Sequence, residues 1–165
     1  MKILKQPSIK KLQAIPVFYL NHFGPYEGET ELFNNLFNQI INLSFKNGIL
    51  TGAFQTAILY HNDIRVVAPE TLKTSVCVTV ENLDNISISQ EEKEMGYGKG
   101  NIESGNYATA SFELMGPEFP KAWEFMMKDF IKKNKHEIAN KPCYDFYPQE
   151  PKDGKYTVDI CIPVN

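Results

Sequence analysis

The sequence contains few cysteines and histidines, and their spacing excludes several kinds of site. The three cysteines, Cys77, Cys143 and Cys161, cannot all pair and form no CxxC motif, which argues against a disulfide framework, a structural zinc site or a redox pair. The three histidines are far apart and form no HxxxH or HExxH motif, which would place two histidine ligands on one helix face. We expect reduced thiols in the core, no metal and no cofactor.

The chain also lacks a long apolar run and a strong excess of either charge. No run approaches the roughly 18 residues of a membrane span, and the start, MKILKQPSIKK, lacks the apolar region of a signal peptide. Lys plus Arg number 17 and Asp plus Glu number 20, giving a net charge of −3, which argues against a large phosphate-binding surface. We expect a cytoplasmic protein with no membrane partner and no direct nucleic-acid partner.

The residues that are present indicate one soluble α+β domain. The chain has 165 residues, of which 42% are hydrophobic and 22% charged, as is usual for a globular domain. Apolar and β-branched runs predict strands, and apolar residues at spacings of three and four predict helices. The expected order is strand 12–23, helix 30–47, strands 53–60 and 74–80, a polar connection 81–100, strand 106–115, helix 120–134, and strands 143–147 and 156–164.

This order contains the same unit twice. Each half reads strand, Gly-Pro, helix, strand, strand, with Gly24-Pro25 and Gly116-Pro117 at the strand-to-helix turns. A single βαββ unit covers one sheet face with its helix, so two such units are expected to pack together. We therefore predict a single domain over 1–165, with antiparallel sheets and two long helices. Its parts are repeat one (about 11–82), a linker (about 83–100) and repeat two (about 101–165). Two unrelated α+β segments are the alternative.

The repeat singles out Asp145 as a candidate binding residue. Aligning Tyr60 with Tyr147 sets Ile58 against Asp145, so the fold itself accepts an apolar residue at this position. An ionised carboxylate in an apolar strand is costly unless a cation or several donors meet it. With Tyr147, and with aromatic residues of neighbouring elements, Asp145 would form a site for an apolar organic cation. The alternative is an Asp145 solvated near a strand end. The expected ligand-binding set is Asp145, Tyr147, Tyr60, Phe112, Trp123 and Ile58.

Several motifs resemble the GyrI-like small-molecule-binding family. They are VFYLNHFGPYEG before the first helix, YATASFELMGPE before the second, CYDFYPQEP and the terminal YTVDICIPV. That family includes the effector-binding domains of AraC-type and MerR-type multidrug-sensing regulators of bacteria and stand-alone DNA gyrase inhibitors. The resemblance implies a SOUL-like fold of two βαββ repeats about a pseudo-twofold axis. It also places on Asp145 the acid at the centre of the family's pocket, a Glu in an aromatic-x-Glu-x-Tyr setting, with Tyr147 as the tyrosine. Asp145 is one methylene shorter than that Glu.

Three functions follow from these observations. The first is a stand-alone module that binds an amphipathic small molecule, cationic or polyaromatic, in drug or toxin sensing or sequestration. The second, implied by the resemblance, is a hydrolase of strained electrophilic natural products that uses Asp145 and Tyr147; we do not expect catalysis, because no Ser-His-Asp or Cys-His spacing supplies a nucleophile. The third is a gyrase-inhibitor-like module whose partner is DNA gyrase. In transcription, a separate regulator chain would read the DNA.

Overall fold

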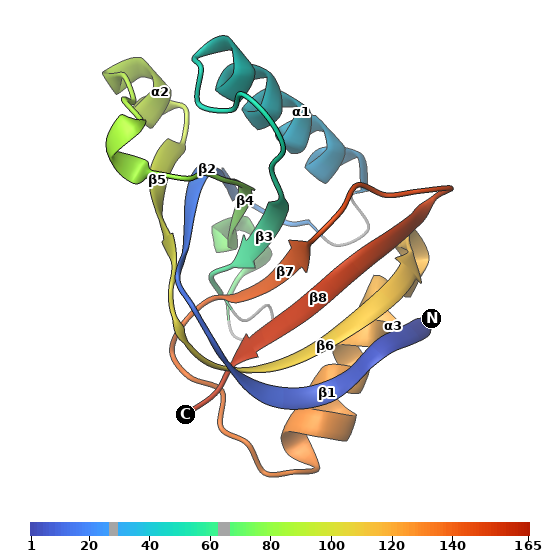
Figure 1. Cartoon of the computed structure of the whole chain (residues 1–165). Coiled ribbons are helices and arrows are strands. Elements are labelled where there is room, and N and C mark those ends of the chain that lie inside the picture. Colours follow the sequence, from blue (N-terminus) through green and yellow to red (C-terminus); the bar gives the residue numbers. More distant parts are fainter. Residues whose placement is uncertain (27–29, 63–66) are drawn as a thin grey trace. The chain divides into compact units, whose positions relative to one another are not determined.

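A computed structural model describes residues 1–26, 30–62 and 67–165 of the chain (Figure 1). Its contacts divide into two compact units. We call Ala14–Glu103 the central unit, and Met1–Gln13 together with Ser104–Asn165 the terminal unit. Glu27 and Gly28, which end the first Gly-Pro motif, lie outside the described residues.

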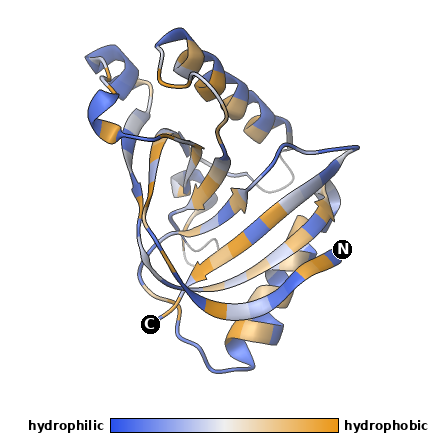
Figure 2. Ribbon diagram, viewed as in Figure 1, coloured by the Kyte–Doolittle hydropathy of each residue, from blue (hydrophilic) through white to orange (hydrophobic). Residues whose placement is uncertain are grey.

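The central unit is a four-stranded antiparallel sheet with one long helix. Its strands are β2 (Ile15–Phe23), β3 (Thr56–Tyr60), β4 (Lys73–Thr79) and β5 (Tyr97–Ile102), in the order β3-β4-β2-β5. Its helices are α1 (Thr30–Lys46), the short α2 (Gln90–Glu94) and the 3-10 turns η1 (Pro69–Thr71) and η2 (Leu83–Asn85). In Figure 2, α1 carries hydrophobic bands between hydrophilic ones. Its buried residues Leu36, Ile40 and Ser44 recur every four positions, as expected of an amphipathic helix.

Gly48 follows the end of α1. Its φ is 69°, in the left-handed region that glycine adopts without a steric penalty. The Ile49 N–H donates to the Ser44 carbonyl at 2.8 Å, which satisfies one of the last carbonyls of the helix. Gly48 is therefore the residue that stops α1.

The terminal unit repeats this arrangement. Its strands are β1 (Lys2–Leu12), β6 (Gly105–Met115), β7 (Cys143–Tyr147) and β8 (Lys155–Pro163), in the order β1-β6-β8-β7. The turn η3 (Gly116–Glu118) leads into the helix, which consists of α3 (Phe119–Glu124) and the wider π-helical segment η4 (Phe125–Lys132). The order β6, helix, β7, β8 matches β2, α1, β3, β4, which confirms the α+β class and the repeated βαββ order.

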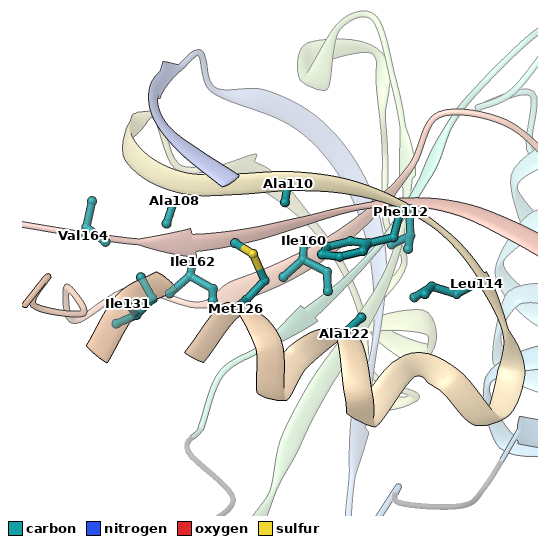
Figure 3. Packing of buried hydrophobic residues seen from close by; sticks show 11 residues of the cluster. Ala108, Ala110, Phe112, Leu114, Ala122, Met126, Ile131, Ile160, Ile162 and Val164 are labelled. Atoms are coloured by element: carbon teal, nitrogen blue, oxygen red, sulfur yellow. The ribbon is translucent and has the colours of Figure 1, made fainter. Parts of the chain in front are cut away.

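The core of the terminal unit lies between its sheet and its helix (Figure 3). Met126 and Ala122 of the helix face Ile160 and Phe112 of the sheet. All four side chains are fully buried. Burying one large apolar side chain contributes roughly 1.5–3 kcal/mol. This apolar layer therefore stabilises the unit, and a polar group buried in it is costly unless it is paired.

Three elements were not predicted from the sequence: β1, α2 and β5. The strand β1 pairs only with β6 among the described strands, contains Pro7 and is mostly exposed, so it lacks the alternation of a half-buried strand. The strand β5 contains Gly98 and Gly100, which are unfavourable in strands. A Cβ at Gly98 would lie 2.4 Å from Cζ of Tyr19, so a larger residue there would have to displace the end of the Tyr19 ring.

Candidate functional site

The carboxylate of Asp145 lies inside the apolar layer of the terminal unit. Asp145 is 0% exposed and stands directly opposite Ile160 on β8. Residues opposite each other in an antiparallel pair project to the same face, and Ile160 packs in the core beneath the helix. Strand alternation places Cys143 and Tyr147 on this face as well, and both pack against the same core. The alternative of a solvated Asp145 is therefore inconsistent with the structure.

Three aromatic rings gather at the same end of the layer. The ring centroids are 6.5 Å apart for Phe119 and Tyr147, 5.5 Å for Phe119 and Tyr156, and 6.3 Å for Tyr147 and Tyr156. All three distances lie within the range of favourable aromatic pairs. We call these residues the Tyr147 cluster. The cluster adjoins the acid because Tyr147 follows Asp145 by two positions on the same strand face.

A hydrogen bond joins the side chains of Tyr147 and Asp145. Burial raises the pKa of Tyr147 well above its ordinary value, and the charge of Asp145, the neighbouring Tyr156 and this hydrogen bond add to the effect. Tyr147 therefore stays protonated at neutral pH, and its hydroxyl donates a hydrogen bond to the Asp145 carboxylate. Donors of this kind favour the ionised form of a carboxyl group, so Tyr147 helps Asp145 to act as an anion.

Asp145 differs in kind from the other buried polar residues. Among the described residues these others carry only hydroxyls: Ser44, Thr74, Ser75 and Thr109. A buried carboxylate costs several kcal/mol unless its charge is compensated. The arrangement can compensate this charge with a ligand cation while the rings of the Tyr147 cluster contact the apolar parts of the same molecule.

The central unit shows that the fold does not need an acid at this position. Ile58 of β3 stands opposite Val76 of β4, just as Asp145 of β7 stands opposite Ile160 of β8. The two registers agree with the sequence alignment of Ile58 with Asp145. Ile58 is 4% exposed, so the central unit fills the same place with an apolar side chain.

The remaining members of the expected set divide between the two units. Phe112 shares the face of Asp145, is 0% exposed and meets Phe125 edge to face at 6.1 Å, as a core residue does. Trp123 is partly buried against the same core. Tyr60 and Ile58 belong to the central unit. Their grouping with Asp145 stays a prediction.

Sequence reasoning missed Phe119 and Tyr156. Phe119 lies just before the helix expected over 120–134, and Tyr156 is the first residue of the strand expected over 156–164. A signal for Tyr156 was present in the hairpin register. Because Asp145 stands opposite Ile160 in an antiparallel pair, the same register sets Tyr147 opposite Val158. Tyr156 is then the diagonal neighbour of Tyr147 on the same face, within reach of a long side chain.

Within residues 1–26, 30–62 and 67–165, no three His, Cys, Asp or Glu side chains converge as a metal site. Over the same residues, none of the helices combines the length and the apolar character needed to cross a bilayer.

Comparison with known proteins gives consistent matches over nearly the whole chain. Residues 5–165 match the model of the family described as GyrI-like small molecule binding domain. A protein of Edwardsiella ictaluri named DNA gyrase inhibitor is 24% identical over 160 residues, which cover 96% of this chain and 97% of that protein.

Two solved structures share the fold. The EcmrR C-terminal domain has a TM-score of 0.75 at 15% identity, with 98% of each chain covered. The structure of SAV2435 bound to tetraphenylphosphonium has a TM-score of 0.58 at 15% identity, covering 97% of this chain and 94% of that one. At these identities the similarity shows a common fold.

Proposed function

This chain belongs to the GyrI-like small-molecule-binding domain family, and we propose that it binds an apolar organic cation at Asp145. Membership confirms the resemblance found in the sequence. The observation that carries the proposal is a fully buried carboxylate beside the Tyr147 cluster.

The chemistry of the site favours a large cation of low charge density. A positive group near Asp145 offsets the cost of burying the carboxylate, and each aromatic ring in contact with a cation contributes roughly 0.5–2 kcal/mol. A neutral ligand of the same shape gains only the apolar contact. The related fold that was solved with tetraphenylphosphonium, a lipophilic cation, supports this ligand class.

We place this binding in drug or toxin sensing or sequestration. The free thiols Cys77 and Cys161 fit a reducing compartment, and we propose the cytoplasm. With the chain acting as a small-molecule module, a separate regulator would carry any effect on transcription.

The test is calorimetric titration of tetraphenylphosphonium into the wild type and Asp145→Asn. At about 6 Å and an effective dielectric constant of about 20, one charge pair contributes about 3 kcal/mol, so we expect the variant to bind about 100-fold more weakly. Glu113→Gln is the matched control: it removes a carboxylate from the same unit that is partly exposed and faces Lys155 at 3.8 Å. It should change the affinity less than threefold. Equal affinities of wild type and Asp145→Asn would rule out the role of Asp145.

The names of the relatives favour a second candidate, an interaction with DNA gyrase. We propose it as an activity separable from the cation site. Purified protein added to a gyrase supercoiling assay should then lower the rate in the wild type and equally in Asp145→Asn. An unchanged rate at protein in large molar excess over gyrase would exclude it.

A further inference from the structure

Two buried polar atoms of the central unit lack a hydrogen-bond partner. They are Nε2 of His22 and Oγ1 of Thr74, and neither has a partner anywhere in the described chain. Thr74 is 1% exposed. Buried polar atoms are almost always paired, and leaving one unpaired costs about 1–3 kcal/mol. Two such atoms at one place indicate that something outside the chain pairs with them.

The two atoms belong to neighbouring side chains. His22 of β2 stands directly opposite Thr74 of β4, and Tyr60 of β3 stands opposite Thr74 on the other side. The three side chains therefore form one row on one face of the sheet, with Cβ atoms of neighbours about 4.5–5.5 Å apart.

Aromatic rings border this row. The ring of Tyr26 lies 5.5 Å from that of Tyr60 and 6.1 Å from that of Phe33 on α1. We call Tyr26, Phe33 and Tyr60 the Tyr60 cluster. Nε2 of His22 points toward the turn that leads to Tyr26, since a Cβ added to Gly24 would lie 3.7 Å from it. All three rings are partly exposed, so the Tyr60 cluster is in contact with solvent.

The repeat shows that the fold does not need these polar groups. In the terminal unit the corresponding pair is Phe112 of β6 opposite Val158 of β8, and both residues are 0% exposed. Phe in place of His22 and Val in place of Thr74 would remove both unpaired atoms, and each is similar in shape to the residue that it would replace. The central unit instead carries His22 and Thr74 beside the Tyr60 cluster. None of these five side chains is an acid.

We propose that the central unit binds a neutral aromatic molecule bearing a hydroxyl, of the phenol class, at His22 and Thr74. One hydroxyl pairs with both atoms: it donates to Nε2 of His22, in the tautomer protonated at Nδ1, and accepts from the hydroxyl of Thr74. The Tyr60 cluster contacts the ring of the ligand. This site differs from Asp145 in its unit, its residues and the charge of its ligand.

The experiment titrates full-length protein with 2-naphthol and with 2-methoxynaphthalene, which keeps the rings but cannot donate. Wild type should bind 2-naphthol at least about tenfold more tightly, because a site built for a donor rejects an analogue that lacks it. Thr74→Val and the double variant His22→Phe, Thr74→Val, which copy the terminal unit, should lose this preference. Both should unfold at or above the wild-type temperature, since an unpaired polar atom is removed.

Two further results separate this site from the cation site. Asp145→Asn should weaken tetraphenylphosphonium binding and leave the affinity for 2-naphthol within threefold. Thr74→Val should weaken 2-naphthol binding and leave the affinity for tetraphenylphosphonium within threefold. If wild type shows no saturable 2-naphthol binding, or if Thr74→Val binds it as tightly as wild type, the two atoms hold a bridging water only and the proposal is wrong. That outcome leaves the proposal for Asp145 intact.

Discussion

Acidification should destabilise the protein through His61. Nε2 of His61 lies 2.8 Å from Oγ of Ser75, which in turn donates to Oδ1 of Asn21 at 2.5 Å. Because the Ser75 hydroxyl has a single proton and gives it to Asn21, Nε2 of His61 must be the donor. Burial, and then the positive charge of Lys73, lower the pKa of His61 from 6.5 to about 4. The folded protein therefore holds His61 neutral.

The sign and size of the effect follow from this pKa. Below about pH 6.5 the unfolded chain binds a proton at His61 that the folded chain does not, so stability falls as the pH falls toward about 4. Each pH unit in this window corresponds to about 1.4 kcal/mol. Between about pH 6.5 and about pH 5 the loss would be about 2 kcal/mol, and because His61 is only half-buried, solvent screening reduces it to about 1 kcal/mol.

The assay is urea unfolding of wild type and His61→Gln at about pH 7 and about pH 5. Glutamine retains a donor for Ser75 but does not titrate, so the variant should lose about 1 kcal/mol less than wild type on acidification. If the two proteins lose the same free energy of unfolding, His61 is not held neutral by the fold and the reasoning fails.

Two smaller predictions concern the elements that sequence reasoning missed. Gly98→Ala should lower the free energy of unfolding by about 1 kcal/mol, because its Cβ would displace the partly exposed Tyr19 ring. Gly52→Ala, with nothing within 4 Å, is the control, and equal urea midpoints would contradict the close packing. Ser89→Ala should cost about 1 kcal/mol, because Ser89 Oγ accepts from the Glu92 N–H at 3.1 Å and caps α2; an unchanged midpoint would show that α2 does not contribute to the cooperative unit.

Local patterns predicted the repeated elements well, since each buries one face. The bounds of β7 agree with the sequence prediction, and α1 ends one residue earlier than expected. Comparing the halves then isolated Asp145, because a residue that the fold does not need stands out against its counterpart Ile58.

What the sequence could not show depends on partners that are distant along the chain. The exposed β1 is a strand only because β6 pairs with it, and Gly98 is compatible with β5 because Tyr19 covers it. The unpaired atoms of His22 and Thr74 become visible only with the register of β2 and β4. In each case the decisive neighbour comes from another strand.

The most direct test of the central claim is a crystal structure of the protein with tetraphenylphosphonium. The account predicts that the phosphorus lies within about 6 Å of the Asp145 carboxylate, a distance at which a charge pair still contributes a few kcal/mol, with phenyl groups against the Tyr147 cluster. A ligand bound elsewhere, with Asp145 enclosed by its own core, would contradict it.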